Sequence, residues 1–209
     1  MQTRLRLLRR LWPWSRQSRV TQEKVLQGKK ILLRPKLMGD AQDDYRWRVD
    51  EELSRLDAAP PLRMGYQEFL SMAESEIRYP ISWTRRFAIE DLASHKHIGN
   101  CMYYDIDYAR KQTELGILIG ERDFWSHGYG TDAVKTMLRH IFMETPITKV
   151  YLHTLEWNVR AQKSFAKCGF VFVKKVRRDG QWFHYMELLK GDFLHLDQAG
   201  GGASEPSAE

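Results

Sequence analysis

The clearest periodic pattern in the chain is a pair of apolar rows, at positions 133, 137 and 141 and at positions 134, 138 and 142. Positions four apart lie on one face of an α-helix, so the pattern predicts an amphipathic helix with one buried side. Two glycines, Gly128 and Gly130, stand at the start of this pattern, and the apolar run Leu115 to Ile119 precedes them. The sequence therefore predicts a strand, a glycine loop and a helix, in that order.

Shorter patterns predict the other elements. Asp179-Gly180 is a strong hairpin signal, Gly169 is a helix stop, and Asp40 is the expected N-cap of the first helix. The predicted strands are 28–36, 82–90, 97–106, 112–120, 149–155, 170–178 and 181–189, and the further predicted helices are 39–55, 66–79 and 158–168. Antiparallel strands come first and a β-α-β crossover follows. This order predicts an α+β fold with a mixed, mostly antiparallel sheet and flanking helices.

The glycine loop is the first candidate for a ligand-binding site. A glycine has no Cβ, so the backbone can curve closely around a ligand. Unpaired amides at a helix start, together with the helix dipole, favour an anion. Strand, glycine loop and helix together predict a phosphate-binding cradle.

The charge of the chain is concentrated at its beginning. Lys and Arg number 33 and Asp and Glu number 27, and the six arginines of residues 1–20 account for the whole excess. The body of the protein is therefore neutral and lacks the basic surface typical of proteins that bind duplex nucleic acid. The tail interleaves Leu and Trp with Arg. It is expected to be disordered, with contact to a membrane surface or to the ribosome as alternatives.

Composition predicts one domain of residues 23–195 between two tails. The chain has 209 residues, 43% of them hydrophobic, which suits a single core. We expect residues 1–22 to form the basic tail, and residues 196–209, rich in Gly, Ala and Ser, to form a disordered C-terminal tail. Cys101 and Cys168 are too few for a disulfide framework, so buried free thiols in the cytoplasm are expected. His95 and His97 lack further ligands nearby, and we expect no metal site.

Three segments in order resemble the GNAT superfamily of N-acetyltransferases, over about Gly28 to Leu189. They resemble most closely the branch of ribosomal-protein N-terminal and spermidine acetyltransferases. The segments are Glu114 to Gly120, Trp125 to Ala133, and Asn158 to Phe170. In that family the first is the central strand, the second the glycine loop and the third the second cofactor motif.

The resemblance implies a GNAT-like sheet in which the central strand splays from its neighbour, with acetyl-CoA as co-substrate in the gap. The pantetheine arm would bond to the central strand, and the pyrophosphate would lie on the loop amides. The residues that the resemblance assigns to cofactor binding are Ile117, Leu118, Ile119, Trp125, Ser126, His127, Gly128, Tyr129, Gly130, Thr131 and Asn158. Trp125 stands where the general pattern has Gln or Arg, although this branch tolerates Trp there.

Transfer of an acetyl group to a primary amine needs a base, because a free alkylamine is mostly protonated at neutral pH. Glu114 opens the central strand near the expected splay, and we predict it as the catalytic base. The simpler alternative is an ion pair with Lys111 or Arg122. Many relatives use a Tyr to protonate the leaving thiolate, but Phe165 stands at that position and cannot donate a proton, so the sequence names no general acid.

Two cofactor residues have simpler interpretations. Asn158 follows a strand and begins a helix, so it is either an N-cap or a cofactor contact. His127 lies in the loop, where a histidinium would strengthen diphosphate binding as pH falls; otherwise it is a solvated loop residue.

Other functions remain open to the sequence alone. One is an inactive acyl-CoA-binding sensor or interaction module, which the missing Tyr at Phe165 favours. Another is an NAD-binding oxidoreductase, because Gly128, Gly130 and Ala133 fit a dinucleotide fingerprint, although residues 121–127 separate the first glycine from the strand. The acceptor is either a small-molecule or a peptide amine. The acidic residues of the first predicted helix favour a cationic amine if they are free, and a homodimer is possible.

Overall fold

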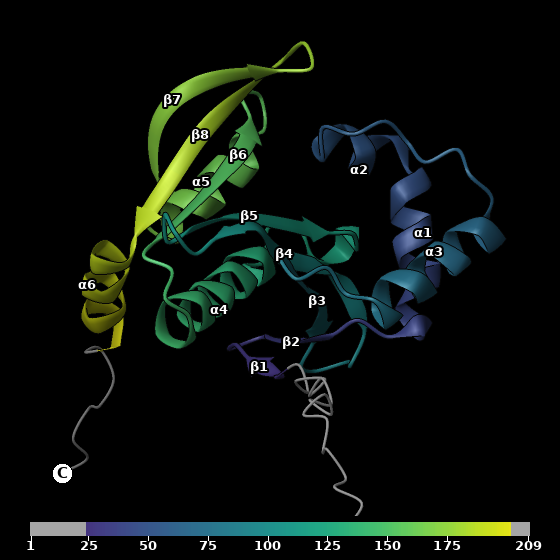
Figure 1. The fold of residues 1–209 in the computed structure, drawn as a ribbon, viewed down its shortest axis with the longest axis horizontal. Helices are drawn as coiled ribbons and strands as arrows, with labels where there is room; N and C mark the ends of the chain where they lie inside the picture. Colours follow the sequence, from purple (N-terminus) through teal and green to yellow (C-terminus); the bar gives the residue numbers. More distant parts are fainter. Residues whose placement is uncertain (1–23, 202–209) are drawn as a thin grey trace, which may run out of the picture.

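The computed structural model describes residues 24–201 of the chain, and Figure 1 shows their fold. Eight strands form one sheet. They are β1 (Leu26–Gln27), β2 (Ile31–Pro35), β3 (Thr84–Asp91), β4 (His97–Asp107), β5 (Gln112–Ile119), β6 (Lys149–Leu155), β7 (Val171–Arg178) and β8 (Gln181–Leu189). The helices are α1 (Ala41–Val49), α2 (Glu51–Leu56), α3 (Tyr66–Arg78), α4 (Tyr129–Glu144), α5 (Val159–Lys167) and α6 (Lys190–Gly201), with short 3₁₀ turns at Met38–Asp40 and Arg122–Phe124.

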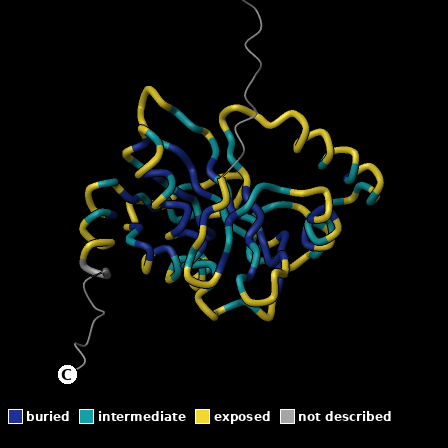
Figure 2. The backbone as a smooth tube through the Cα atoms, turned by 90° about the horizontal axis from the view of Figure 1, so that it is seen from below, coloured by how far each residue is buried: buried dark blue, intermediate teal, exposed yellow. Residues whose placement is uncertain are grey.

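The strand order is β1-β2-β3-β4-β5-β6-β8-β7, and all neighbours are antiparallel except β5 and β6. This is the predicted mixed, mostly antiparallel α+β sheet. Helix α4 buries its apolar rows in a core that reaches from Leu33 on β2 to Leu188 on β8. Figure 2 shows this buried centre surrounded by exposed loops and by the outer helices. Helices α1, α2 and α3 group together, apart from α4 (Figure 1).

Strands β5 and β6 pair over only three positions, from Gln112 with Lys149 to Glu114 with Tyr151. Beyond Glu114 the two strands separate, while β5 stays paired with β4 as far as Ile119. One edge of β5 is therefore open over residues 115–119. This is the splay of the central strand that the resemblance implies.

Most predicted elements are confirmed, and two differences have clear physical reasons. Strands β6 and β8 have the predicted bounds, and Asp179 and Gly180 both have positive φ, as a tight hairpin requires. The first predicted helix is broken at Asp50, whose backbone is extended and whose side chain accepts from the Leu53 amide to cap α2. Asp40 does not cap α1 but binds Arg34.

Strand β1 and helix α6 were not among the predicted elements. Helix α6 runs to Gly201, past residue 196, where the C-terminal tail is predicted to begin. The predicted basic tail, residues 1–22, lies outside the described residues. Within the described part of the chain, no helix is both long enough and apolar enough to cross a membrane.

Helix α1 docks onto the end of β5 through Trp47, which is 1% exposed. A Cβ built on Gly120 would overlap the indole ring of Trp47. The indole nitrogen donates to Glu121 at 3.1 Å. Gly120 and Glu121, which follow β5, therefore hold α1 in place, the first by packing and the second by a hydrogen bond. This contact fixes the chain just before the glycine loop.

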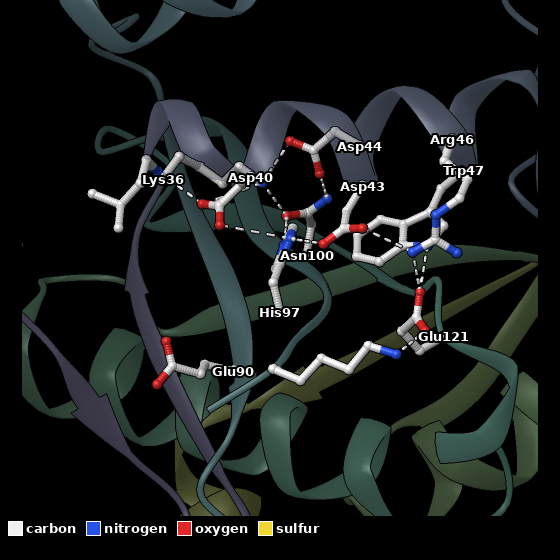
Figure 3. A network of polar contacts seen from close by, with 12 residues as sticks. Lys36, Asp40, Asp43, Asp44, Arg46, Trp47, Glu90, His97, Asn100 and Glu121 are labelled. Atoms are coloured by element: carbon white, nitrogen blue, oxygen red, sulfur yellow. Dashed lines mark hydrogen bonds and ion pairs between the residues drawn. The ribbon is translucent and has the colours of Figure 1, made fainter. Parts of the chain in front are cut away.

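A polar network beneath α1 extends this contact across the sheet (Figure 3). Arg34 makes two hydrogen bonds of 2.9 Å with Asp40, and Lys36 lies 2.6 Å from Asp44. Burial opposes ionisation of Asp40, but the hydrogen bonds from Arg34 and from the Leu37 amide outweigh it and hold the pKa of Asp40 below its usual value. Asp40 is therefore held as an anion by Arg34 and by the Leu37 amide.

Glu121 is the second centre of the network. Burial disfavours its carboxylate, but hydrogen bonds from Lys96, Arg46 and Trp47 outweigh that effect and lower the pKa of Glu121 to about 2. The carboxylate joins α1 to the segment that leads into the glycine loop.

We predict that Gly120→Ala destabilises the protein, because the added methyl group cannot enter the space of the buried Trp47 ring. Overpacking of this kind costs about 1–3 kcal/mol. Gly39→Ala is the matched control, since nothing lies within 4 Å of its Cβ position; its free energy of unfolding should stay within about 0.5 kcal/mol of wild type. Urea unfolding of both variants checks this, and equal stabilities would contradict the proposed packing.

We also predict that Glu121→Gln destabilises the fold in a pH-dependent way. A carboxyl whose pKa is lowered by folding adds stability above its unfolded pKa, and this stability is lost as pH falls toward the folded pKa. Glu121→Gln should cost roughly 2–3 kcal/mol at pH 7, and the difference from wild type should shrink between about pH 5 and pH 2. Urea unfolding at several pH values measures the difference; a gap that is constant over this range would refute the ion-pair account.

Candidate active site

A cavity of about 330 Å³ opens where β5 and β6 separate. Its walls come from α2, the open edge of β5, the glycine loop, the start of α4, and α5. The lining residues that the sequence predicted for cofactor binding are Ile117, Leu118, Ile119, Trp125, Ser126, Gly128, Gly130, Thr131 and Asn158. The fold thus brings the three motifs, far apart in sequence, around one space.

The glycine loop presents free backbone donors at this cavity. Within the described residues, the six amides of residues 126–131 donate no hydrogen bond, whereas the flanking amides of Trp125 and Asp132 donate to Arg122 and Gly128. Ser126 and Gly128 have φ of 64° and 86°, and such left-handed residues curve successive amides into an anion-binding concavity. The dipole of α4 adds positive potential at the same place.

The predicted residues His127 and Tyr129 are not among those that line the cavity. The carbonyl of His127 accepts from the Lys30 side chain at 2.8 Å, and the Tyr129 ring packs edge-on against Phe124. Neither side chain lines the cavity, so any contribution of these two residues to ligand binding would come from their backbone amides.

Asn158 combines both of its predicted interpretations. Its Oδ1 accepts from the Ala161 amide at 3.2 Å, which caps α5, and the residue also lines the cavity. The cap uses only the amide oxygen, so the side-chain nitrogen is not needed for it. The hydroxyl groups of Thr131 and Ser164, which both line the cavity, lie 2.9 Å apart and join the start of α4 to the middle of α5.

Glu114 lies at the point where the two strands part. Leu115 faces the core under α4, and side chains alternate along a strand, so Glu114 faces the opposite side of the sheet. Glu114 is 5% exposed, and its Oε1 lies 2.8 Å from Nδ1 of His153 on β6. Neither Lys111 nor Arg122 is its partner. In place of the alternative ion pair with a Lys or Arg, Glu114 forms a buried pair with the His153 imidazole.

Tyrosines surround this pair. Burial raises the pKa of Tyr104, and the negative charge of Glu114 raises it further. Burial and the carboxylate of Glu187 raise the pKa of Tyr185 to about 12. The ring of Tyr185 lies 5.2 Å from that of His153. These phenols stay protonated at neutral pH and provide hydrogen-bond donors beside the fork.

Several cavity residues were not predicted from the sequence. Helix α2 contributes Leu53 and Leu56, and Asp57 follows it. The sequence of α2 gave no sign that this helix would contact the glycine loop, because the two segments are about 70 residues apart. Helix α5 contributes Arg160, Lys163 and Lys167 at a spacing of three and four residues. That helical spacing was visible in the sequence and places all three cations on one face.

The acidic residues of the first helices are largely neutralised within the fold. Asp43 pairs with Arg46, and Arg122 lies 2.9 Å from both Asp50 and Glu52. Together with the pairs of Asp40 and Asp44, these contacts leave little free negative charge on α1. Most of this acidic cluster is therefore balanced by basic neighbours and is not free to attract a cationic amine.

The two cysteines are buried and unpaired, as predicted. Burial raises the pKa of both thiols to about 12, so neither is a reactive thiolate. Residues 24–201 contain no group of three or more His, Cys, Asp or Glu side chains arranged to hold a metal ion.

A known protein family matches most of this chain. The family model of the acetyltransferase (GNAT) domain matches residues 30–171. Comparison with curated protein sequences gave no match.

Solved structures share the fold. Spermidine N-acetyltransferase from Vibrio cholerae, in complex with CoA and spermine, is 22% identical with a TM-score of 0.69 and covers 79% of this chain and 98% of its own. A putative ribosomal-protein-serine acetyltransferase from Vibrio cholerae is 16% identical with a TM-score of 0.66, covering 81% and 99%. A putative acetyltransferase from T. thermophilus is 17% identical with a TM-score of 0.69, covering 84% and 94%.

The family match spans most of the chain and includes the open strand edge, the glycine loop, and the whole of α5 with the turn that follows it. The chain therefore belongs to the GNAT acetyltransferases, whose acetyl donor is acetyl-CoA.

Proposed function

We propose that the protein transfers the acetyl group of acetyl-CoA to a primary amine by direct attack in a ternary complex. The observation that carries this proposal is the set of six unpaired loop amides beside the open edge of β5. These amides belong to exposed or half-buried residues at a helix start and are free to donate to a ligand, and a diphosphate on the loop would accept from them. The open edge would accept the amide-containing pantetheine arm as an additional strand.

The residues present fit this cofactor. Nine of the predicted contact residues line one cavity. A Cβ placed on Gly130 would lie 3.6 Å from the Ile119 side chain and 3.9 Å from the Ile117 side chain, so the loop lies close to β5. One contact differs from the expectation: the Ile119 carbonyl already accepts from the Trp125 indole at 2.7 Å. Acetyl-CoA would supply the activated thioester, and the protein would supply position and proton transfer.

Glu114 is the proposed base. It is buried at the fork, and the Nδ1 atom of His153 holds its carboxylate in one orientation. A base at this point would take the proton that an ammonium substrate must lose before attack. Amides on the open edge of β5 would then donate to the oxygen that gains negative charge. Phe165 lines the cavity and has no acidic proton, so the proposal assigns no general acid.

The acceptor is proposed to be a cationic small-molecule or peptide amine. Asp57 lines the cavity, and Asp57, Asp105 and Glu114 all act electrostatically on Tyr104, which places several carboxylates around the fork. Negative potential there would attract an ammonium group. The spermidine enzyme among the structural neighbours binds spermine, which supports a polyamine as one candidate.

The alternative of an inactive acyl-CoA-binding module shares the same cavity, so activity must separate the two. Thiol release from acetyl-CoA should be screened against polyamines, aminoglycosides, amino acids and N-terminal peptides. Release with at least one amine class supports the enzyme. Tight CoA binding without release for any class favours the binding module. The oxidoreductase alternative requires a doubly wound parallel sheet, and the observed sheet has one parallel pair.

For Asn158 we predict that its two roles can be separated. Asn158→Ser keeps a side-chain oxygen that can cap α5 but loses the amide nitrogen. It should unfold at nearly the wild-type temperature and bind CoA several-fold more weakly in calorimetry. Asn158→Ala should lose both properties, with about 1 kcal/mol of stability lost. Wild-type CoA affinity in Asn158→Ser would mean that Asn158 is a cap alone.

For Glu114 we predict a loss of turnover without a loss of cofactor affinity. Glu114→Gln cannot accept a proton from the amine, so kcat should fall by roughly 10²- to 10⁴-fold, with the Kd for acetyl-CoA nearly unchanged. Glu187→Gln, a carboxylate on the adjacent β8, serves as the control and should keep most activity. Near-normal turnover of Glu114→Gln at pH 7 would remove Glu114 from the mechanism.

A further inference from the structure

Helix α5 borders the cavity with an uncompensated row of cations. Arg160, Lys163 and Lys167 all line the cavity, and none of them forms an ion pair within the described part of the chain. By contrast, Arg122 at the other side of the loop is neutralised by Asp50 and Glu52. Positive charge left unpaired beside a cavity is available to an anionic ligand.

Arg160 is the member of this row that is held in place. Its guanidinium lies over the ring of Trp125, 3.8 Å from the ring centre. The ring is itself fixed, because its nitrogen donates to the Ile119 carbonyl at 2.7 Å. Trp125 immediately precedes the six unpaired amides, so the stacked guanidinium is held next to the anion-binding loop from the opposite wall of the cavity.

An anionic ligand would stabilise the charge of Arg160. Burial lowers the pKa of its guanidinium, and Glu52 is the one carboxylate that acts on it in the opposite sense. Arginine stays charged under such conditions, and among the described residues its side-chain N–H groups donate no hydrogen bond, so the Trp125 ring and Glu52 leave these donors free. A planar guanidinium forms paired hydrogen bonds with phosphate oxygens, which would satisfy these donors.

We propose that Arg160, oriented by the face of Trp125, is a ligand of the diphosphate of CoA. This inference rests on the proposed function. In the general form of the loop, a Gln or Arg stands where this chain has Trp125. Here the loop supplies an aromatic platform at that position, and α5 supplies the cation from across the cavity.

The test compares Arg160→Met with Arg160→Lys. Methionine keeps an unbranched apolar stem against the indole but loses the charge, whereas lysine keeps the charge but loses the planar fork. Arg139→Met is the matched control, because Arg139 lies on α4 outside the cavity and pairs with Asp197. Calorimetry should measure the Kd for CoA and for dephospho-CoA, which lacks the 3′-phosphate, at low and high salt. Thermal unfolding verifies that each variant folds.

We expect Arg160→Met to weaken binding of CoA and of dephospho-CoA by the same factor, roughly ten- to a hundredfold. Arg160→Lys should lose less, and Arg139→Met should bind as wild type. The wild-type Kd should also rise more steeply with salt than that of Arg160→Met, because one charge pair is screened.

Three results would overturn the inference. Unchanged CoA affinity in Arg160→Met would show that Arg160 does not contact the ligand. Equal losses in Arg160→Met and Arg160→Lys would indicate a packing role. A loss for CoA but not for dephospho-CoA would place Arg160 on the 3′-phosphate. If wild type binds neither ligand, the proposed function itself fails; if wild type binds both and Arg160→Met binds equally well, only the role of Arg160 fails.

Discussion

The separation of β5 from β6 after Glu114 is the constraint on which the rest of the structure depends. Strands that stop pairing leave backbone donors and acceptors that must find other partners. Here the open edge of β5, the unpaired amides of the glycine loop and the cationic face of α5 all border the same cavity. The fold thus brings unpaired main-chain groups and a cationic helix face to one cavity.

Ion pairs hold the wall of the cavity that α2 forms. Glu121 and Arg122, directly after the β5–loop junction at Gly120, bind α1 and the start of α2 through Arg46, Asp50 and Glu52. Trp47 packs on Gly120 in the same place. These contacts bind α1 and α2 to the segment that leads into the glycine loop. The same residues therefore position both the loop and helix α2, which supplies Leu53 and Leu56 to the cavity. The acidic residues of α1 are paired with basic residues of the protein, so we expect the acceptor amine to bind where β5 and β6 separate.

The sequence predicted the sheet and the cofactor loop because both depend on local patterns. Alternation, helical spacing and the signals at Gly169 and Asp179-Gly180 act over a few residues, and the elements that they predict are present. The partner of Glu114 could not be found in this way, because His153 meets it only once β6 lies beside β5. The inward pairing of Asp40 likewise depends on a tertiary contact with Arg34, whereas the break of the first helix at Asp50 rests on a local cap that the helical pattern alone did not reveal. The cationic face of α5 could have been found, since its spacing is local, but its target required the fold.

Amide hydrogen exchange, read residue by residue by NMR with and without CoA, tests the central claim most directly. If the loop amides hold the diphosphate and the open edge of β5 holds the pantetheine arm, CoA should slow exchange at residues 126–131 and at unpaired amides within 115–119, with little change in β3. Exchange at the loop that is unaffected by saturating CoA, or protection confined to other parts of the sheet, would contradict the account.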